Sequence, residues 1–417
     1  MRSLSILTKP YLAVVPPKPG LDHVWIDLLP MLPGGANGGA KPFIFALLQR
    51  LAARRPGVRF TAVCQADAAH ELRAIETDNL EIIVQETATL DRGSDQKRWL
   101  GSRRLAKLQQ RLLVGGADRK IPKAQLLFCP FGVPLIQRPA LATVCTFYDL
   151  QVEAYPNFFS PEVQRERLGH FRRMVSCATR IAAISEYSRE LAITKGVEQQ
   201  LIRAIAIQIT PRPVSVPGDS SDAPPPLGLG HQGYILYPAN LWKHKNHELL
   251  FTAFAMARQQ GLDPNLKLVC SGDGFERLQE LRKVASGLGL ADAVLLPGFV
   301  SDTIMQALYR HALAVVFPSL YEGFGMPVIE AMGQGLPVAC SNSTALQEVA
   351  GSAALLFHPG CPQEIATALH RLGEDGELRN TLIERGKVQA QRYQDPDAMA
   401  DQYWDLFCEA LTSSKVR

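Results

Sequence analysis

Glu322 and Glu330 are two glutamates separated by seven residues, and the stretch between them contains Gly323, Gly325 and Pro327. A carboxylate can accept paired hydrogen bonds from the hydroxyls of a ribose or a sugar ring. Glycines let backbone amides approach a ligand closely, and proline suits the first position of a helix, whose amino end attracts anions. The pattern therefore predicts a cradle for a diphosphate group, flanked by two carboxylates that can hold sugar hydroxyls.

A simpler interpretation exists for both glutamates. Glu330 falls in the first turn of the predicted helix, where a carboxylate stabilises the helix dipole, and Glu322 could be an ordinary loop residue in water. We prefer the functional interpretation because the two carboxylates surround a glycine-rich loop that follows a buried apolar strand.

Lys245 is either an ordinary exposed lysine or a functional residue, and its place at the start of the predicted helix 246–260, where a cation is unfavourable, favours a function. A compact ammonium can stabilise the charge that develops on a departing phosphate without a metal. The neighbouring His244 and His247 have Glu248 beside them but no carboxylate trio and no D-x-D motif. We therefore expect no metal at this site.

These residues lie in a chain whose apolar pattern alternates throughout. Short β-rich runs alternate with amphipathic helical patterns, which gives seven predicted strands in residues 23–209 and six in residues 233–357. This alternation is typical of parallel βαβ units. The segment between the two regions is rich in Pro, Gly, Ser and Asp and has no periodicity, so it is predicted to be a linker.

We therefore predict an α/β protein with two Rossmann-like domains that face each other across a cleft. The predicted parts are an N-terminal domain (1–210), the linker (211–232), a C-terminal domain (233–395) and a C-terminal helix that packs back on the first domain (396–417).

The composition is that of a globular protein, with 47% hydrophobic and 20% charged residues. No apolar run approaches the roughly 20 residues that cross a bilayer. The first 20 residues contain a short apolar patch, but prolines and lysine interrupt it and no small-residue cleavage site follows. We expect an N-terminal extension on a cytoplasmic protein.

The charge is distributed unevenly along the chain. Residues 1–212 carry 29 Lys and Arg against 18 Asp and Glu, whereas the remaining residues carry 15 against 22. A basic half suggests an anionic partner such as phospholipid headgroups or polyprenyl phosphates. Nucleic acid is not expected, because aromatic residues are not interleaved with the basic ones. Basic and apolar residues alternate near helical spacing from Arg92 to Lys120, which predicts either peripheral binding to an anionic membrane or a solvated helix face.

As a set, these segments resemble the family 4 retaining glycosyltransferases of the GT-B type. The match rests on E-G-F-G-x-P-x-x-E-A from Glu322 onward, with FPS before it and G-x-P-V after it. Further matching segments are YPANLWKHKNHELL (237–250), SGDG (271–274), LPGFVSD (296–302), PGGANGGAK (33–41), TFYDLQ (146–151) and ISEYSR (184–189).

The resemblance implies that residues 1–210 form the acceptor-side domain and residues 233–395 the nucleotide-sugar donor domain, and it implies a role for each matching residue. Glu330 would hold the nucleotide ribose, Glu322 would hold the donor sugar, and Lys245 would neutralise the diphosphate. The other implied donor-binding positions are Gly38 and Gly39 facing the phosphates, Phe299 and Val300 near the base, and the backbone of Phe324, Gly325, Met326 and Pro327 at the sugar and diphosphate.

The sequence departs from the family pattern at two places. Many relatives carry an arginine where this chain has Asn240, and Lys243 would supply the missing charge. Many relatives have His-Asp where this chain has Tyr148 and Asp149. That histidine touches the donor sugar in relatives, so Tyr148 would contact the sugar and change the choice of donor or weaken catalysis. Asp149 is the candidate catalytic carboxylate of the first domain.

The resemblance implies transfer of a hexose, with mannose favoured, from GDP-mannose or a UDP-sugar to a glycan or polyprenyl-linked acceptor. The nucleotide sugar is a co-substrate, and no other cofactor is expected. Such enzymes act in polysaccharide and lipopolysaccharide biosynthesis, on or near the cytoplasmic face of a membrane. Two alternatives remain: a non-catalytic nucleotide-sugar or glycan binding protein, suggested by Asn240 and Tyr148, and a GT-B nucleotide-sugar epimerase, for which Asp149 is the obvious acid/base candidate.

Overall fold

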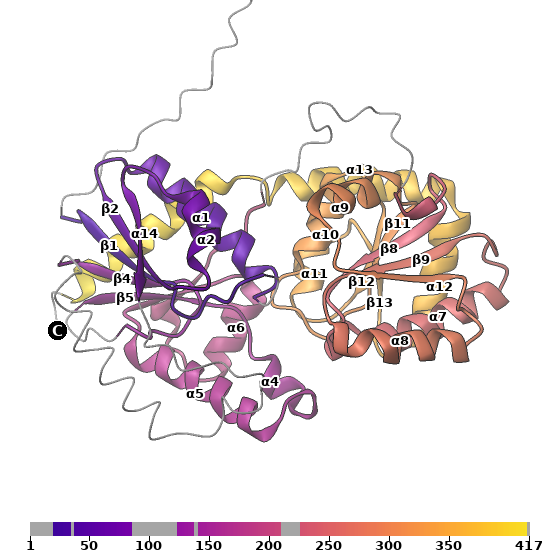
Figure 1. Cartoon of the computed structure of the whole chain (residues 1–417), viewed down its shortest axis with the longest axis horizontal. Coiled ribbons are helices and arrows are strands. Elements are labelled where there is room, and N and C mark those ends of the chain that lie inside the picture. Colours follow the sequence, from indigo (N-terminus) through magenta and orange to yellow (C-terminus); the bar gives the residue numbers. More distant parts are fainter. Residues whose placement is uncertain (1–19, 35–36, 86–122, 137–140, 210–225, 415–417) are drawn as a thin grey trace, which may run out of the picture.

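The computed structural model describes residues 20–34, 37–85, 123–136, 141–209 and 226–414. These residues form two lobes that lie side by side (Figure 1). The predicted basic stripe Arg92–Lys120, the first 19 residues and most of the predicted linker lie outside the described residues.

The first lobe is built on a parallel sheet with the strand order β3-β2-β1-β4-β5-β6-β7 among the described residues. Its strands are β1 His23–Asp27, β2 Arg59–Gln65, β3 Leu80–Gln85, β4 Leu126–Cys129, β5 Ala142–Phe147, β6 Arg180–Ala183 and β7 Ile202–Ala204. The helices of this lobe are α1 Ala40–Arg54, α2 Ala69–Leu72, α4 Gln151–Ala154, α5 Pro161–Cys177, α6 Glu186–Thr194 and α14 Pro396–Ser414.

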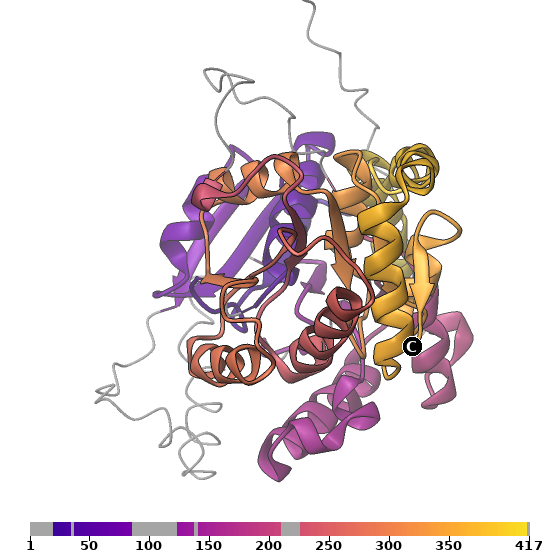
Figure 2. The ribbon, with the colours of Figure 1, turned by 90° about the vertical axis from the view of Figure 1, so that its right-hand side faces the viewer.

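The second lobe is built on another parallel sheet, in the order β10-β9-β8-β11-β12-β13. Its strands are β8 Tyr234–Pro238, β9 Lys267–Ser271, β10 Val294–Gly298, β11 Ala314–Phe317, β12 Val338–Ser341 and β13 Leu355–Phe357. Its helices are α7 His247–Gln259, α8 Phe275–Gly287, α9 Asp302–His311, α10 Met326–Gly333, α11 Ala345–Ala350, α12 Pro362–Glu374 and α13 Gly376–Gln391. Figure 2, which is turned by 90° from Figure 1, has this lobe toward the viewer.

The central strands are buried on both faces, as parallel strands covered by helices must be. In β1, Val24 and Ile26 belong to one core cluster and Trp25 belongs to another, because successive side chains point to opposite faces of the sheet. Strand β5 divides in the same way, with Val144 in the first cluster and Cys145 in the second.

Side-chain caps start several of the helices. Ser160, Ser185, Ser301 and Asp375 each precede a helix, and each accepts a hydrogen bond from a backbone N–H of the first turn. Such a cap stabilises a helix by about 0.5–2 kcal/mol. Local sequence therefore fixes where α5, α6, α9 and α13 begin.

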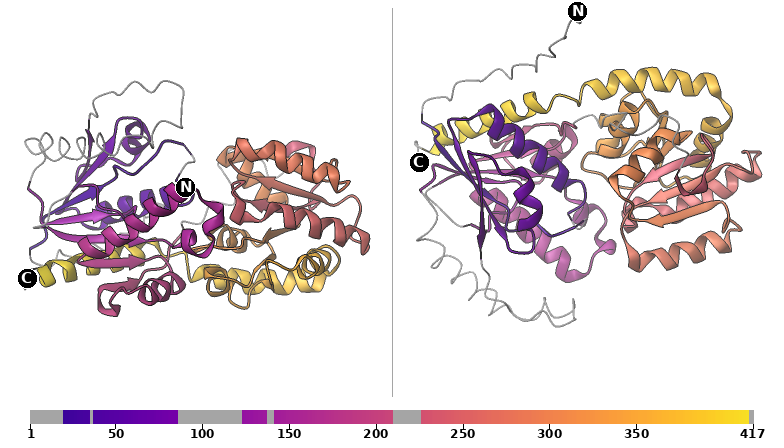
Figure 3. Two further views of the ribbon diagram at one scale, coloured as in Figure 1. Left: turned by 90° about the horizontal axis from the view of Figure 1, so that it is seen from below. Right: turned by 45° about the horizontal axis from the view of Figure 1, so that its top comes forward.

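The C-terminal helix α14 crosses from the second lobe to the first and packs against α1, β5 and β6. The right-hand view of Figure 3 shows α13 and α14 following the same side of the two lobes. Tyr403 and Phe407 bury their rings against Phe128, with centroid distances of 5.6 and 5.1 Å. The Tyr403 hydroxyl lies 3.2 Å from Thr146 Oγ1.

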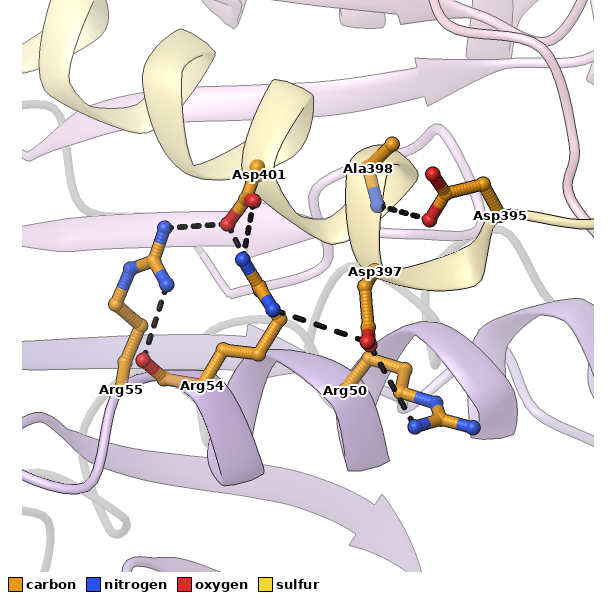
Figure 4. A network of polar contacts seen from close by, with 7 residues as sticks. All are labelled: Arg50, Arg54, Arg55, Asp395, Asp397, Ala398 and Asp401. Atoms are coloured by element: carbon orange, nitrogen blue, oxygen red, sulfur yellow. Dashed lines mark hydrogen bonds and ion pairs between the residues drawn. The ribbon is translucent and has the colours of Figure 1, made fainter. Parts of the chain in front are cut away.

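A charged network joins α14 to α1 (Figure 4). Arg54 donates to both carboxylate oxygens of Asp401, at 3.0 and 2.5 Å, and Arg55 donates to the same carboxylate at 2.8 Å. Asp397 is paired with Arg54 at 3.7 Å and with Arg50 at 3.5 Å. The helix is thus held to the first lobe by both apolar and charged contacts.

Candidate active site

The strand orders create a topological switch point in each sheet. In the second sheet, β8 and β11 are neighbours from which the chain continues toward opposite edges, and in the first sheet β1 and β4 have the same relation. Ligands of open parallel sheets bind outside the carboxyl ends of the strands at such points. Lys245 follows β8, Glu322 follows β11, and the Gly38–Gly39 turn follows β1.

Lys245 and Glu322 form an ion pair, with 2.5 Å between Nζ and Oε1. The side chains are only 11% and 13% exposed, and the ammonium lies 5.1 Å from the centre of the Phe317 ring. Because solvent screens this pair weakly, its charges act strongly on each other and on any charged ligand nearby. The structure therefore brings together two residues that are far apart in the sequence.

Asp149 approaches this pair from the first lobe. Burial raises the pKa of its carboxyl group, and the charge of Glu322 adds to the rise, whereas Arg167 and Lys245 oppose it. The Asp149 Oδ1 atom accepts the backbone N–H of Gln151 at 2.9 Å. A half-buried carboxyl group with a raised pKa, beside a charged pair, is suited to hold a proton.

Hydrogen bonds at Lys245 and at the next residue, Asn246, fix the turn that carries Lys245. The Tyr237 hydroxyl donates to the Lys245 carbonyl at 2.6 Å. Asn246 has a φ of +63°, and its side-chain amide donates to the carbonyls of Pro318 at 3.1 Å and Pro359 at 2.8 Å. Pro318 lies just after β11, so Asn246 ties the Lys245 turn to the loop that carries Glu322.

The loop after Glu322 turns directly into α10. Gly325 has a φ of +107°, and a Cβ there would lie 2.5 Å from Leu346 Cδ2, so both backbone conformation and space require glycine. Pro327 is the second residue of α10, where its missing N–H costs no helix hydrogen bond. The half-buried Met326 and the buried Phe324 flank Gly325 at the amino end of the helix.

Glu330 is the fifth residue of α10, so its predicted position in the first turn is wrong. The helix begins at Met326, one residue earlier than predicted, because Gly325 can adopt the left-handed conformation that starts it. The Glu330 Oε2 atom accepts the hydroxyl of Tyr309 at 3.1 Å. A role for Glu330 as a first-turn dipole residue is therefore excluded.

Side chains of the second lobe reach the first βα turn of the first lobe. A Cβ on Gly38, whose φ is +54°, would lie 3.2 Å from the Trp242 ring, and a Cβ on Gly39 would collide with the Met326 Cε atom. The loops at the carboxyl ends of the two sheets thus meet at the predicted diphosphate position.

Asn240 and Lys243, which flank the predicted phosphate lysine, differ in their surroundings. Asn240 Oδ1 accepts the backbone N–H of Asp273 at 2.9 Å, which joins the loop after β8 to the loop after β9. Lys243 is exposed. Its ammonium can therefore move, whereas Asn240 has a structural contact.

The remaining predicted residues lie at strand ends. Phe299 follows β10 with 73% of its side chain exposed, and Val300 beside it is half-buried. The Tyr148 hydroxyl donates to the Pro130 carbonyl at 2.8 Å, and the Tyr148 and Phe43 rings form a T-shaped pair. The Tyr148 hydroxyl is thus bonded within the first lobe.

The two histidines beside Lys245 are neutral at pH 7. Burial lowers the pKa of His244 to about 4 and the pKa of His247 to about 3, and the charge of Lys245 contributes to both shifts. In the part of the chain that the structure describes, no group of three or more His, Cys, Asp or Glu side chains could hold a metal ion.

Sequence reasoning missed two residues near this site. Asn246 had a signal, since asparagine tolerates a positive φ better than most residues and directly precedes a helix. Glu348 had none, because its partners are backbone N–H groups of α6 in the other lobe.

Comparisons with known proteins give a family match for the second lobe. Residues 222–389 match the family described as "Glycosyl transferases group 1". This part of the chain is therefore similar to the group 1 glycosyl transferases.

Several curated proteins are similar in sequence. The chain is 29% identical over 254 residues to the O-antigen chain mannosyltransferase B of Escherichia coli, covering 60% of this chain and 66% of that protein. It is 28% identical over 294 residues to the D-inositol 3-phosphate glycosyltransferase of Acidothermus cellulolyticus, covering 67% and 61%. The chain thus spans slightly less than two thirds of the length of these two relatives.

Solved structures show the same fold. Anabaena Alr3699/HepE in complex with UDP and glucose superposes with a TM-score of 0.70 at 20% identity, over 94% of this chain and all of that one. WaaG, a glycosyltransferase involved in lipopolysaccharide biosynthesis, gives a TM-score of 0.62 at 16% identity, over 92% and 99%. The fold is GT-B, as predicted. None of the helices in the described residues has the length and apolar character needed to cross a membrane.

Proposed function

Because residues 222–389 match the group 1 glycosyl transferases, we propose that this chain is a retaining, metal-independent glycosyltransferase. It moves a hexose from a nucleotide diphosphate sugar to a glycan or lipid-linked acceptor. The observation that carries the proposal is the poorly exposed Lys245–Glu322 pair at the switch point, where the Gly38–Gly39 turn of the first lobe meets Trp242 and Met326 of the second. A fixed cation beside a carboxylate suits a donor whose diphosphate leaves from a sugar.

In the proposed reaction, an acceptor hydroxyl attacks the anomeric carbon from the face that the diphosphate leaves. A phosphate oxygen takes the hydroxyl proton, and the new glycosidic bond forms as the bond to the diphosphate breaks. Lys245, the amino end of α10 and the Gly38–Gly39 turn stabilise the departing charge. Glu322 orients the sugar, Glu330 holds the ribose, and Asp149 faces the reacting centre.

Mannose from GDP-mannose is the first choice of donor. The name of the Escherichia coli relative, a mannosyltransferase, supports it, whereas the UDP and glucose in Alr3699/HepE support a UDP-sugar as the second choice. A thermal-shift series with GDP-mannose, UDP-glucose, UDP-galactose and the free nucleotides distinguishes them: the true donor raises Tm the most, because a ligand stabilises the state that it binds.

The reaction itself is tested by nucleotide diphosphate release, measured with and without a lipid-linked glycan acceptor. We expect release that depends on the acceptor and is lowered in Glu322→Gln, together with a product of unchanged anomeric configuration. Conversion of the donor without any acceptor would indicate an epimerase, and binding without turnover would indicate a non-catalytic protein. Either outcome would refute the proposal. The proposed location is the cytoplasm, at the inner face of a membrane that carries the acceptor.

A further inference from the structure

The loop that carries Glu322 is docked on the first lobe through its next residue. The Ser185 hydroxyl donates to the Gly323 carbonyl at 2.8 Å across the two lobes. A Cβ on Gly323 would lie 2.8 Å from the Tyr148 carbonyl oxygen and 3.4 Å from the Asp149 Cβ. The backbone after Glu322 therefore rests directly on the strand end that carries Asp149.

A second contact joins the lobes beside this one. Glu348, in α11 of the second lobe, accepts the backbone N–H of Glu186 at 3.0 Å through Oε1 and that of Tyr187 at 2.9 Å through Oε2. These are the first two residues of α6 in the first lobe. Such N–H groups have no partner within their own helix, and they form the positive end of the helix dipole.

The two oxygens of Glu348 thus make charge-assisted hydrogen bonds to a helix of the other lobe. Ser185 supplies the local cap, since its hydroxyl accepts the Ser188 N–H at 3.1 Å. Helix α6 is therefore capped twice, once from within its own lobe and once from the neighbouring lobe.

Glu348 is connected to Glu322 through the start of its own helix. The Glu322 N–H donates to Thr344 Oγ1 at 3.0 Å, and the Ala345 N–H donates to the Glu322 carbonyl at 3.4 Å. Thr344 and Ala345 immediately precede and begin α11. Any displacement of α11 from α6 must therefore move the Glu322 backbone as well.

We propose that Glu348 is a positioning residue for the transfer reaction, because its cap on α6 holds the Glu322 loop at a fixed distance from Asp149. The role rests on the proposed function, whereas the cap itself does not. Glu348 is half-buried, and it is not among the residues proposed to bind the donor.

The test compares Glu348→Ala and Glu348→Gln with the control variant Glu364→Ala. Glu364 also accepts a backbone N–H, from His358 at 2.7 Å, but both residues belong to the second lobe. We expect Glu348→Ala to lower kcat roughly 10- to 100-fold, as small displacements of reacting groups do. The Kd for the free nucleotide diphosphate should stay unchanged, because its proposed contacts lie mainly in the second lobe. The kcat of Glu348→Gln should lie between those of the parent and Glu348→Ala, since glutamine keeps one acceptor oxygen.

A second readout reports the cap without using activity. Hydrogen exchange of the peptide that covers the first turn of α6 should accelerate in Glu348→Ala and stay at the parental rate in Glu364→Ala. A parental kcat in Glu348→Ala, or equal losses of kcat and nucleotide affinity, would overturn the positioning role. If the parent shows no transfer at all but the exchange behaves as expected, the proposed function fails while the cap stands.

Discussion

At the scale of single residues, Lys245 and Glu322 depend strongly on each other, because neither charge is well hydrated. With 11% and 13% exposure, each group depends on the other for its stabilisation. A donor diphosphate would offer Lys245 a second partner, and Glu322 would then be free to accept the sugar hydroxyls. In the proposed reaction, the pair would therefore contact both the diphosphate and the sugar of the donor.

The division of labour among the three charged residues can be tested by steady-state kinetics. Glu330→Ala should mainly raise the donor KM, because a ribose contact is nearly the same in the ground and transition states. Lys245→Ala should mainly lower kcat, by roughly 10²–10³-fold, because its partner charge grows in the transition state. Glu322→Gln should lower turnover and leave nucleotide diphosphate binding close to normal by calorimetry.

A matched control is Lys387→Ala, which removes a half-exposed lysine that pairs only with Glu384 among the described contacts. It should behave like the parent. Full turnover in Glu322→Gln, or parental kinetics in Lys245→Ala, would show that this segment is not the donor site.

Asn246 has two separate effects, which two substitutions can distinguish. Asn246→Gly keeps the positive φ but loses both side-chain hydrogen bonds, and it should cost roughly 1–3 kcal/mol of unfolding free energy. Asn246→Ala loses the bonds and must also hold alanine at φ +63°, which adds about 1 kcal/mol. Urea unfolding measures both. Equal stability of the two variants would mean that the backbone conformation is irrelevant.

Helices and strands were largely predictable because each carries its own periodic signal. Each of the thirteen predicted strands overlaps an observed one, although the run 202–209 yields only the short strand Ile202–Ala204. The bounds of helix α5 were not predicted, since only Met174 of its seventeen residues is buried. Contacts between distant elements could not be predicted from local sequence patterns. The cap on α6, for example, is made to backbone N–H groups, which nearly every residue possesses.

Helix α14 offers a test of how much a charged network contributes to the attachment of one element. Arg54 and Arg55 have side chains only 10% and 2% exposed, whereas Asp401 is 34% exposed. Asp401→Ala would leave two poorly solvated guanidinium groups without their shared carboxylate. We expect a loss of roughly 1–3 kcal/mol in unfolding free energy, below that of a fully buried pair because Asp401 is partly hydrated.

Glu384→Ala is the control for this experiment, because its side chain is 73% exposed and its pair with Lys387 lies on one helix. It should change the unfolding free energy by less than about 0.5 kcal/mol. If Asp401→Ala is equally mild in a urea titration, the apolar contacts alone hold α14 in place.

At the scale of the whole molecule, the uneven charge predicts reversible binding to anionic membranes. The basic first half and the stripe Arg92–Lys120 motivate it, although the stripe lies outside the described residues. Sedimentation with vesicles should show binding to anionic lipid that weakens as salt rises, because salt screens the attraction. Equal binding to neutral and anionic vesicles at low salt would contradict an electrostatic contribution.

The crossing of α14 also has a consequence for the order in which the protein can be made. The core of the first lobe contains Phe128 and, from the far end of the chain, Tyr403 and Phe407. A ribosome delivers residues 234–391 of the second lobe before it delivers this helix. The first lobe is therefore translated first but completed last. The face of its sheet that α14 covers stays without this helix until the second lobe has been synthesised.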